Sequence, residues 1–79
     1  MAILGKICKD IEMNVNYPGN GISPIERRAS SAEECRNVCQ QEAMCVGWTW
    51  IRETCYPKTK MARSESKNNW VSGLRDCKG

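Results

Sequence analysis

The sequence has no phenylalanine and no histidine, and its large apolar side chains are few. Its 79 residues include three tryptophans and two tyrosines, and only 41% of the chain is hydrophobic even when cysteine is counted. A chain of this length forms one domain, and the apolar surface it can bury is small beside the conformational entropy that folding costs. We therefore expect the fold to depend on cross-links.

The missing histidine also limits the chemistry available to the chain. No side chain has an ordinary pKa near neutrality, and neither a paired acidic motif nor a glycine-rich phosphate loop is present. Asp10 and Asp76 lie close to cysteines in the sequence, where we interpret them as solvated charges. We therefore predict a protein that is not an enzyme and uses no cofactor.

Long hydrophobic runs are absent too, and residues 1–5 are too few to form a signal-peptide core. We expect no membrane insertion. We assign residues 1–5 to a start segment or linker and residues 6–78 to a single module, which suggests a longer parent protein with neighbouring domains. The net charge of +3 is spread among nine acidic residues, a pattern that does not indicate nucleic-acid binding.

What the chain does have is six cysteines. A zinc site would normally use CxxC pairs or Cys/His sets, whereas here the spacing from Cys35 is CxxxC, then five residues, then nine. We therefore expect disulfides and no metal. Disulfides at this density persist in secreted, lumenal or surface environments, which predicts an extracellular protein.

A helix is predicted after residue 31. Ser31, followed three residues later by Glu34, forms a capping box, in which each side chain accepts a hydrogen bond from a backbone N–H of the first turn. The helix should run from about Ala32 to about Ala43. Apolar residues recur at three- and four-residue intervals and predict one buried face. These residues are Ala32, Cys35, Val38, Cys39 and Ala43.

Extended segments are expected before the helix. Residues 7–11 resemble a short strand, and residues 17–21 contain a Pro-Gly and an Asn-Gly pair, which favour a chain reversal. Residues 22–28 form a second extended segment, which Pro24 confines to an edge or a strand end.

Beyond the helix, the apolar period changes from 3.6 to 2, which predicts a strand over residues 46–51. Residues 52–54 then form a turn and residues 55–58 a second strand, so that the two strands make a hairpin. Residues 60–69 are polar without apolar periodicity and are expected to be a solvated loop. Residues 70–74 return to strand.

The predicted core consists of Val38, Val46, Trp48 and Trp50. Trp48 and Trp50 share one face of a strand, and burying large aromatic side chains against the helix is the largest stabilising contribution that this composition offers. The alternative is that the two indoles form a stacking platform for a sugar. Trp70 adjoins the polar loop and is compatible with either the core or the surface.

Six cysteines permit fifteen pairings, and spacing alone does not select one. Cys35 and Cys39 lie one helical turn apart with nearly parallel Cβ vectors, which disfavours a bridge between them and favours bridges from both to the sheet. Cys39 is close in sequence to Cys45, which leaves Cys35 to reach Cys55 and the first cysteine to reach the last. Because such bridges rival the whole stability of a small domain, we expect the reduced chain to be largely unfolded at body temperature.

Four motifs together resemble the PAN/apple family, and within it the apple domains of apicomplexan microneme adhesins. They are Ser31-Ala32-Glu33-Glu34-Cys35 with Cys39, Cys45-Val46-Gly47-Trp48-Thr49-Trp50, Cys55-Tyr56-Pro57-Lys58 and Val71-Ser72-Gly73. The resemblance covers Cys8 to Cys77. It implies an α+β, disulfide-rich fold in which an antiparallel β-sheet cradles one α-helix. The disulfides that it implies are Cys8–Cys77, Cys35–Cys55 and Cys39–Cys45.

The chain departs from the family pattern at Pro57, where an aliphatic residue usually stands. Proline removes a ladder donor, which predicts an edge strand or a bulge and leaves the geometry at Lys58 open.

The resemblance implies an extracellular adhesion or recognition module that binds a protein partner or host-surface ligand, as one unit of a larger, multi-domain microneme-type adhesin. A lectin that binds a galactose-type or anionic carbohydrate on the cell surface and a structural spacer in a tandem array are the alternatives. The residues Arg52, Tyr56, Lys58 and Lys60 gather around the predicted hairpin and could bind an anionic glycan or an acidic partner. The competing interpretation is a solvated face of scattered charges.

Overall fold

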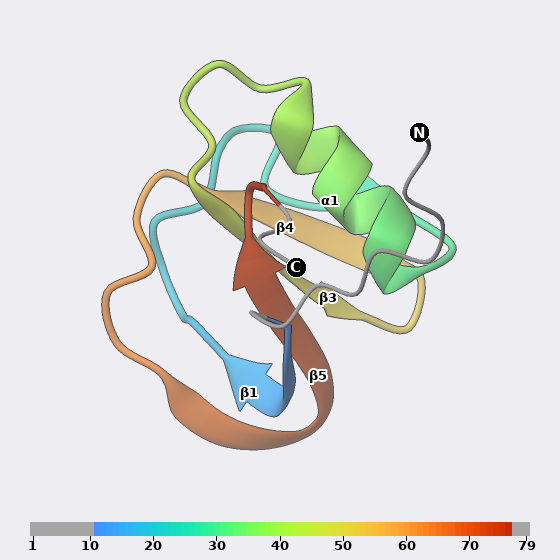
Figure 1. Ribbon diagram of the computed structural model, residues 1–79, viewed down its shortest axis with the longest axis vertical. Helices are drawn as coiled ribbons and strands as arrows, with labels where there is room; N and C mark the ends of the chain where they lie inside the picture. The colour runs from blue at the N-terminus through green and yellow to red at the C-terminus, as the bar shows by residue number, and fades with distance from the viewer. Residues whose placement is uncertain (1–10, 77–79) are drawn as a thin grey trace, which may run out of the picture.

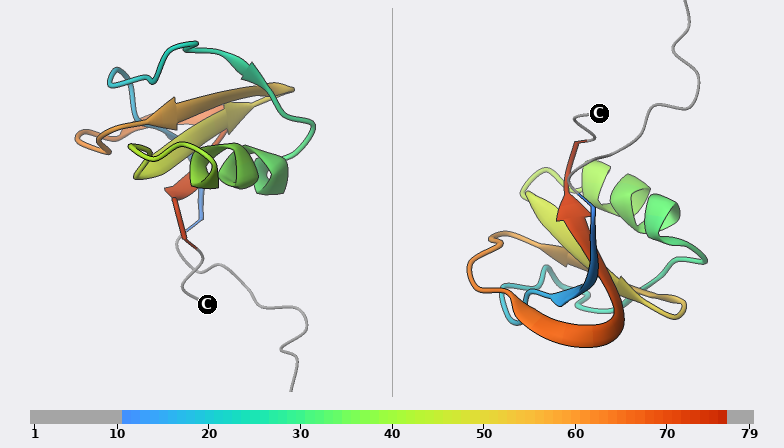
Figure 2. Two further views of the ribbon diagram at one scale, coloured as in Figure 1. Left: turned by 90° about the horizontal axis from the view of Figure 1, so that it is seen from above. Right: turned by 60° about the horizontal axis from the view of Figure 1, so that its bottom comes forward.

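The computed structural model describes residues 11–76, which form one five-stranded antiparallel sheet and one helix (Figure 1). The strand order is β1-β5-β3-β4-β2. In chain order the elements are β1 (Glu12–Asn16), β2 (Arg27–Arg28), α1 (Ala32–Gln40), β3 (Gly47–Ile51), β4 (Thr54–Lys58) and β5 (Glu65–Leu74). The helix lies against one face of the sheet, and the segment that connects β1 to β2 runs across the other (Figure 2). We call these two surfaces the helix face and the loop face.

Helix α1 begins where the sequence predicts. The hydroxyl of Ser31 accepts a hydrogen bond from the backbone N–H of Glu34 at 3.1 Å. The return contact differs from a strict capping box, because the Glu34 carboxylate accepts from the backbone N–H of Ser30 at 2.5 Å and from its hydroxyl at 3.1 Å. These bonds lower the pKa of the Glu34 carboxyl.

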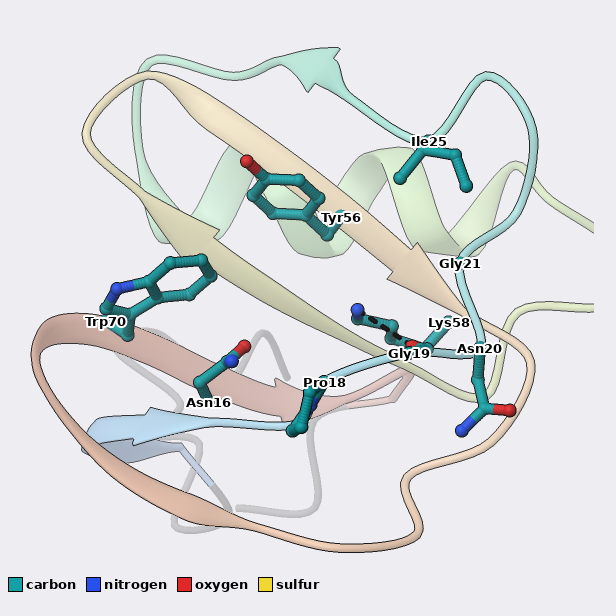
Figure 3. Close-up of a pocket in the computed structure, with 9 residues that line it drawn as sticks. All are labelled: Asn16, Pro18, Gly19, Asn20, Gly21, Ile25, Tyr56, Lys58 and Trp70. Carbon is teal, nitrogen blue, oxygen red and sulfur yellow. Dashed lines mark hydrogen bonds between the residues drawn. The ribbon is translucent and has the colours of Figure 1, made fainter.

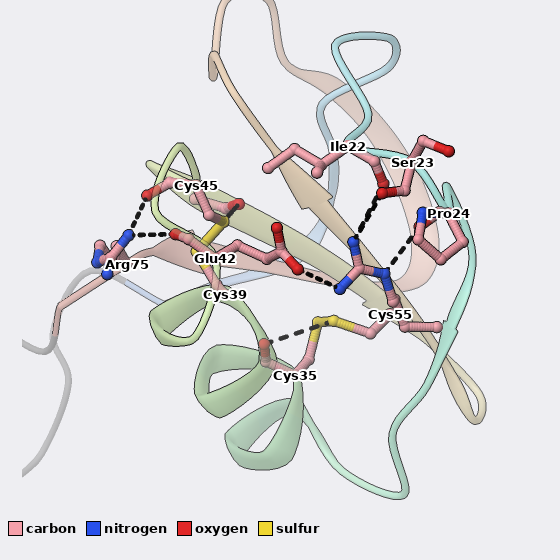
Figure 4. Close-up of polar contacts among 11 residues, drawn as sticks. Ile22, Ser23, Pro24, Cys35, Cys39, Glu42, Cys45, Cys55 and Arg75 are labelled. Carbon is pink, nitrogen blue, oxygen red and sulfur yellow. Dashed lines mark hydrogen bonds and ion pairs between the residues drawn. A yellow bond between two sulfur atoms is a disulfide. The ribbon is translucent and has the colours of Figure 1, made fainter.

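The helix ends at Gln40, three residues before the predicted end. The Cys39–Cys45 disulfide turns the chain back at this point. The guanidinium of Arg75 then donates to the backbone carbonyls of Glu42 and Cys45 at 2.6 and 2.9 Å (Figure 4), and to that of Gln40 at 2.8 Å. Because an arginine that directly follows β5 satisfies these carbonyls, the helix needs no further turn.

The helix face holds the core. Trp48 is fully buried there, and its indole Nε1 donates to the carbonyl of Leu74 at 3.0 Å. Opposite it lies Gly73, where an added Cβ would come within 2.6 Å of the Trp48 ring. Trp50 is partly buried on the same face, and its Nε1 donates to the carbonyl of Ala29 at 2.8 Å. The core therefore uses both indoles, with their polar atoms bonded to backbone.

Two disulfides, Cys35–Cys55 and Cys39–Cys45, lie within the described residues (Figure 4). Their four cysteines are at most 2% exposed, so the sulfur atoms form much of the core. They are the pairs that helix geometry and the family resemblance indicated. The third expected pair, Cys8–Cys77, lies outside the described residues, as do residues 7–10 of the first predicted strand.

Of the four predicted core residues only Val46 is exposed, whereas Val38, like Trp50, is partly buried against the core. Val46 is wrong as a core residue, because its side chain is 45% exposed. It lies just before β3 begins at Gly47, so the alternating pattern of the strand does not apply to it. Val38 is partly buried and packs against the core cluster from the helix.

Two strand segments were not predicted, namely β1 and the first half of β5. The predicted loop over residues 60–69 is wrong from Glu65 onward, because Glu65–Asn69 form the first half of β5 and pair with β1. Both segments are polar and largely exposed, so they lack the apolar alternation that identifies a half-buried strand. Of the extended segment predicted over residues 22–28, only β2 is a strand, and it pairs with the start of β4.

Pro57 lies inside β4 without breaking its pairing to β3. Its carbonyl accepts a hydrogen bond from the N–H of Ile22 at 3.0 Å, on the side of β4 that faces away from β3. Because the N and C=O of one strand residue point to the same side, the imide nitrogen also faces away from β3. The proline therefore removes no bond between β3 and β4.

Candidate functional site

A cavity of about 370 Å³ opens on the loop face (Figure 3). Strand β4 contributes Tyr56 and Lys58, and β5 contributes Trp70. The end of β1 and the connection that follows it form the opposite wall. The residues of that wall are Asn16, Pro18, Gly19, Asn20, Gly21 and Ile25.

The loop wall is held on β4 by backbone hydrogen bonds. Gly19 and Asn20 adopt positive φ angles of 79° and 58°, as the Pro-Gly-Asn-Gly stretch predicts for a tight reversal. The N–H of Thr59 donates to the carbonyl of Asn20 at 2.9 Å, and the N–H of Ile22 bonds the carbonyl of Pro57. The cavity is therefore built between two segments that are bonded to each other.

Tyr56 and Trp70 form an aromatic wall. Their rings stack with centroids 5.7 Å apart and planes 23° from parallel. Neither the Tyr56 hydroxyl nor the Trp70 indole N–H has a hydrogen-bond partner among residues 11–76. Burial, and then the charge of Glu26, raise the pKa of Tyr56, so its hydroxyl stays protonated at neutral pH. The wall thus offers apolar rings together with two donors.

Lys58 is the most deeply buried charged residue of the cavity, at 5% exposure. Its Nζ donates to the carbonyl of Gly19 at 2.9 Å and lies 5.6 Å from the centroid of the Tyr56 ring. None of the ion pairs formed among residues 11–76 includes Lys58. Burial lowers the pKa of the Lys58 ammonium.

A chain of polar contacts lies beside the aromatic wall. The side-chain amide of Asn16 donates to the carboxylate of Glu65 at 2.8 Å, and this bond, followed by the charge of Lys67, lowers the pKa of the Glu65 carboxyl. Lys67 Nζ lies 3.6 Å from the same carboxylate and 5.6 Å from the centroid of the Trp70 ring. The carboxylate of Glu65 is therefore already bound by two partners.

Of the four predicted site residues, Tyr56 and Lys58 line the cavity, whereas Arg52 and Lys60 do not. Arg52 is exposed in the turn between β3 and β4, at the opposite end of β4 from Lys58. Lys60 is exposed beyond the end of β4. Sequence reasoning placed the four together because they are close along the chain.

Trp70 and Asn16 were not assigned to the site from the sequence. Trp70 reaches it because the polar start of β5 is a strand and not a loop. In Trp70-Val71-Ser72 the outer two residues share a strand face, and Ser72 lies opposite Thr49, which lies opposite Tyr56. This register could have placed Trp70 next to Tyr56, had the strand pairing been known.

A second cavity, of about 270 Å³, lies between β2 and the turn before β4. Arg28 and Glu53 form an ion pair across it, with side chains 84% and 64% exposed. Arg27 is used internally, since it bonds the Glu42 carboxylate at 2.8 Å and the Pro24 carbonyl at 2.8 Å. The two adjacent arginines therefore do not act as one basic patch.

Within the described part of the chain, no group of three or more metal-ligating side chains comes together. In the same part, no helix has the length and apolar character needed to cross a membrane.

Comparison with known proteins identifies one family and one fold. A model of the PAN domain matches residues 15–63. The chain is similar in structure to a PAN module from Eimeria tenella, solved in solution, with a TM-score of 0.63 and 23% sequence identity over 90% of this chain and 84% of that one. A search of curated proteins finds no match.

Proposed function

The chain belongs to the PAN domain family, and from this membership and the geometry of the loop-face cavity we propose that it is an extracellular recognition module that binds the end of a cell-surface glycan. The observation that carries the proposal is the cavity itself, in which two aromatic rings adjoin a buried ammonium. A sugar ring carries both apolar C–H patches and polar hydroxyls. The aromatic rings can pack against the C–H patches, and the ammonium can donate to the hydroxyl oxygens.

The size and polarity of the cavity support this ligand. About 370 Å³ lies at the lower end of the range of small-molecule sites, which suits one or two sugar rings. The Tyr56 hydroxyl and the Lys58 ammonium can donate to sugar oxygens, and the backbone of Gly19 and Asn20 forms part of the wall. The wall formed by Tyr56 and Trp70 supplies apolar contact.

A protein partner is the second candidate. Ile25, on the rim of the cavity, is 51% exposed, and an exposed aliphatic side chain beside a concave site is suited to a protein surface. In this alternative an acidic side chain of the partner would enter the cavity.

We further propose that the module is one unit of a multi-domain adhesin of the microneme type. This proposal rests on the sequence motifs that resemble that branch of the family. The buried disulfides support an extracellular location, because such bonds persist in oxidising compartments. A spacer without a ligand of its own is the remaining alternative.

The test is a glycan array probed with the wild-type module and with Trp70→Ala. We expect the wild type to bind a defined set of glycans in a manner that free sugar competes away, and Trp70→Ala to lose that binding. The matched control is Arg52→Ala, which removes an exposed side chain outside the cavity and should leave binding unchanged.

Two outcomes would contradict the proposal. If Arg52→Ala lost glycan binding and Trp70→Ala retained it, the binding site would lie at the hairpin turn and not in the cavity. An array without any bound glycan, combined with capture of one acidic protein that Trp70→Ala no longer captures, would favour the protein partner.

A further inference from the structure

We infer that the ligand of the loop-face cavity carries an anionic group, a carboxylate or a sulfate, which binds the ammonium of Lys58. This inference rests on the proposed function, and it names the class of glycan that the cavity selects. The observation behind it is a buried cation that no carboxylate neutralises within the described chain.

A buried lysine is costly when it has no counter-ion. Lys58 is only 5% exposed, and lysine is almost never this buried unless it is paired. Its one hydrogen bond within residues 11–76 goes to a neutral acceptor, the Gly19 carbonyl, at 2.9 Å. An ammonium has three donors, so two remain. A bound anion would satisfy them and offset the lost hydration.

The ammonium points into the cavity. In Figure 3 the end of the Lys58 side chain points toward the space bordered by the rings of Tyr56 and Trp70 and the amide of Asn16. A ligand that contacts the rings therefore comes next to Nζ. A bond between an ammonium and a carboxylate or sulfate is about twice as strong as one between neutral groups, and poor solvent access strengthens it further.

Glu65, whose carboxylate is bonded to Asn16 of the cavity, does not take the place of such a ligand. The Glu65 carboxylate is bound by the Asn16 amide at 2.8 Å and lies 3.6 Å from Lys67 Nζ. It pairs with Lys67 and not with Lys58. Lys67 itself lies over the Trp70 ring, so a second cation stands beside the aromatic wall.

The competing explanation is that Lys58 only fastens the loop wall through its bond to Gly19. The two explanations differ in what they require of the ligand. If Lys58 only holds the loop in place, the affinity for a glycan does not depend on the charge of the glycan. If Lys58 binds an anionic group of the ligand, an acidic glycan binds more tightly than its neutral counterpart.

The experiment uses matched sets on a glycan array: neutral glycans and the same glycans carrying a sialic acid, a uronic acid or a sulfate. Wild type, Lys58→Met and Lys60→Met are compared at low salt. Lys58→Met keeps the length of the side chain without its charge, and Lys60→Met removes the charge of an exposed lysine outside the cavity.

We expect the wild type and Lys60→Met to prefer acidic members by about 10-fold, as for a free-energy difference of about 1.4 kcal/mol. Lys58→Met should bind acidic and neutral members equally. Comparing the glycans that carry a sialic or uronic acid with those that carry a sulfate shows whether the preferred anionic group is a carboxylate or a sulfate. Should Lys58→Met not fold, the salt dependence of the wild type decides, because binding of acidic members must weaken from low to high salt more than that of neutral members.

Equal binding of acidic and neutral glycans by the wild type, lost in Trp70→Ala, would overturn this inference and leave the proposed function standing. Preference for acidic glycans that persists in folded Lys58→Met would also overturn it. Absence of any glycan binding would instead remove the proposed function.

Discussion

The two faces of the sheet use the same few residue types for opposite purposes. On the helix face, Trp48 is fully buried and its indole N–H is bonded to a backbone carbonyl, as is that of the partly buried Trp50. On the loop face, Tyr56 and Trp70 are partly exposed and their polar atoms have no partner among residues 11–76. A satisfied aromatic group stabilises the fold, whereas an unsatisfied one at a cavity is available to a ligand.

Both disulfides of residues 11–76 lie on the helix face, which therefore depends on covalent bonds. Complete reduction should remove roughly 5 kcal/mol through Cys35–Cys55 and Cys39–Cys45 alone, which approaches the whole stability of a small domain. We expect the reduced and alkylated protein to show no cooperative thermal transition in circular dichroism. A cooperative melt near the wild-type temperature would contradict the account.

Truncating one indole on each face sharpens the comparison. Trp48→Ala should lower the free energy of unfolding by about 4 kcal/mol, because it empties a fully buried site. Trp70→Ala should lower it by only about 1 kcal/mol, the contribution of a half-exposed stacked ring. Urea denaturation measures both. Equal losses would mean that the two faces do not differ in this way.

The close packing under Trp48 predicts a smaller effect at Gly73. Gly73→Ala should cost about 2 kcal/mol, because the new Cβ would lie 2.6 Å from an indole that is fully buried and bonded to the Leu74 carbonyl. In a Trp48→Leu background the same change should cost much less, since the ring is gone. A double-mutant cycle by urea denaturation measures this coupling, and additive costs would argue against the contact.

The smallest expected effect concerns the pH dependence of stability. Because burial lowers the pKa of Lys58, the unfolded chain holds that proton more tightly than the folded one. The free energy of unfolding should therefore rise as pH increases through the lowered pKa toward the unfolded value, by at most about 1.4 kcal/mol per pH unit.

This rise ends near the unfolded lysine pKa of about 10.4, a range that overlaps the titration of unfolded tyrosines, so it is measured as the difference between the profiles of wild type and Lys58→Met. Tyr17 and Tyr56 have raised pKa values, that of Tyr17 about 12 through its bond to Glu12, so their stabilising effect fades only as pH climbs past the unfolded tyrosine value near 10. Lys58→Met should lack the rise, and Lys60→Met should retain it. Identical profiles for wild type and Lys58→Met would contradict the assignment.

More of the helix face than of the loop face was predictable from the sequence. Ser31 and Glu34 located the start of the helix, and the alternation through Trp48 and Trp50 located β3. These patterns are local, because one turn of helix or one strand carries them. The fold expected from the family motifs is the fold found, a sheet with one helix on its face.

The loop-face cavity depends on contacts between segments far apart in the chain. Asn16 reaches Glu65, and Lys58 reaches Gly19, across separations of 49 and 39 residues. A polar strand such as Glu65–Asn69 carries no apolar pattern that would reveal its pairing with β1. Tyr56 and Lys58 could be proposed from composition, but Trp70 required the register of the sheet.

The most direct test of the division between the faces is an NMR titration that follows the three indole N–H signals. Labelled protein is titrated with the glycan that binds most tightly on the array. We expect the Trp70 signal to shift with ligand, while the signals of Trp48 and Trp50, whose indole N–H groups are bonded to backbone carbonyls, stay in place. Shifts at Trp48 and Trp50 with an unmoved Trp70 would contradict this expectation.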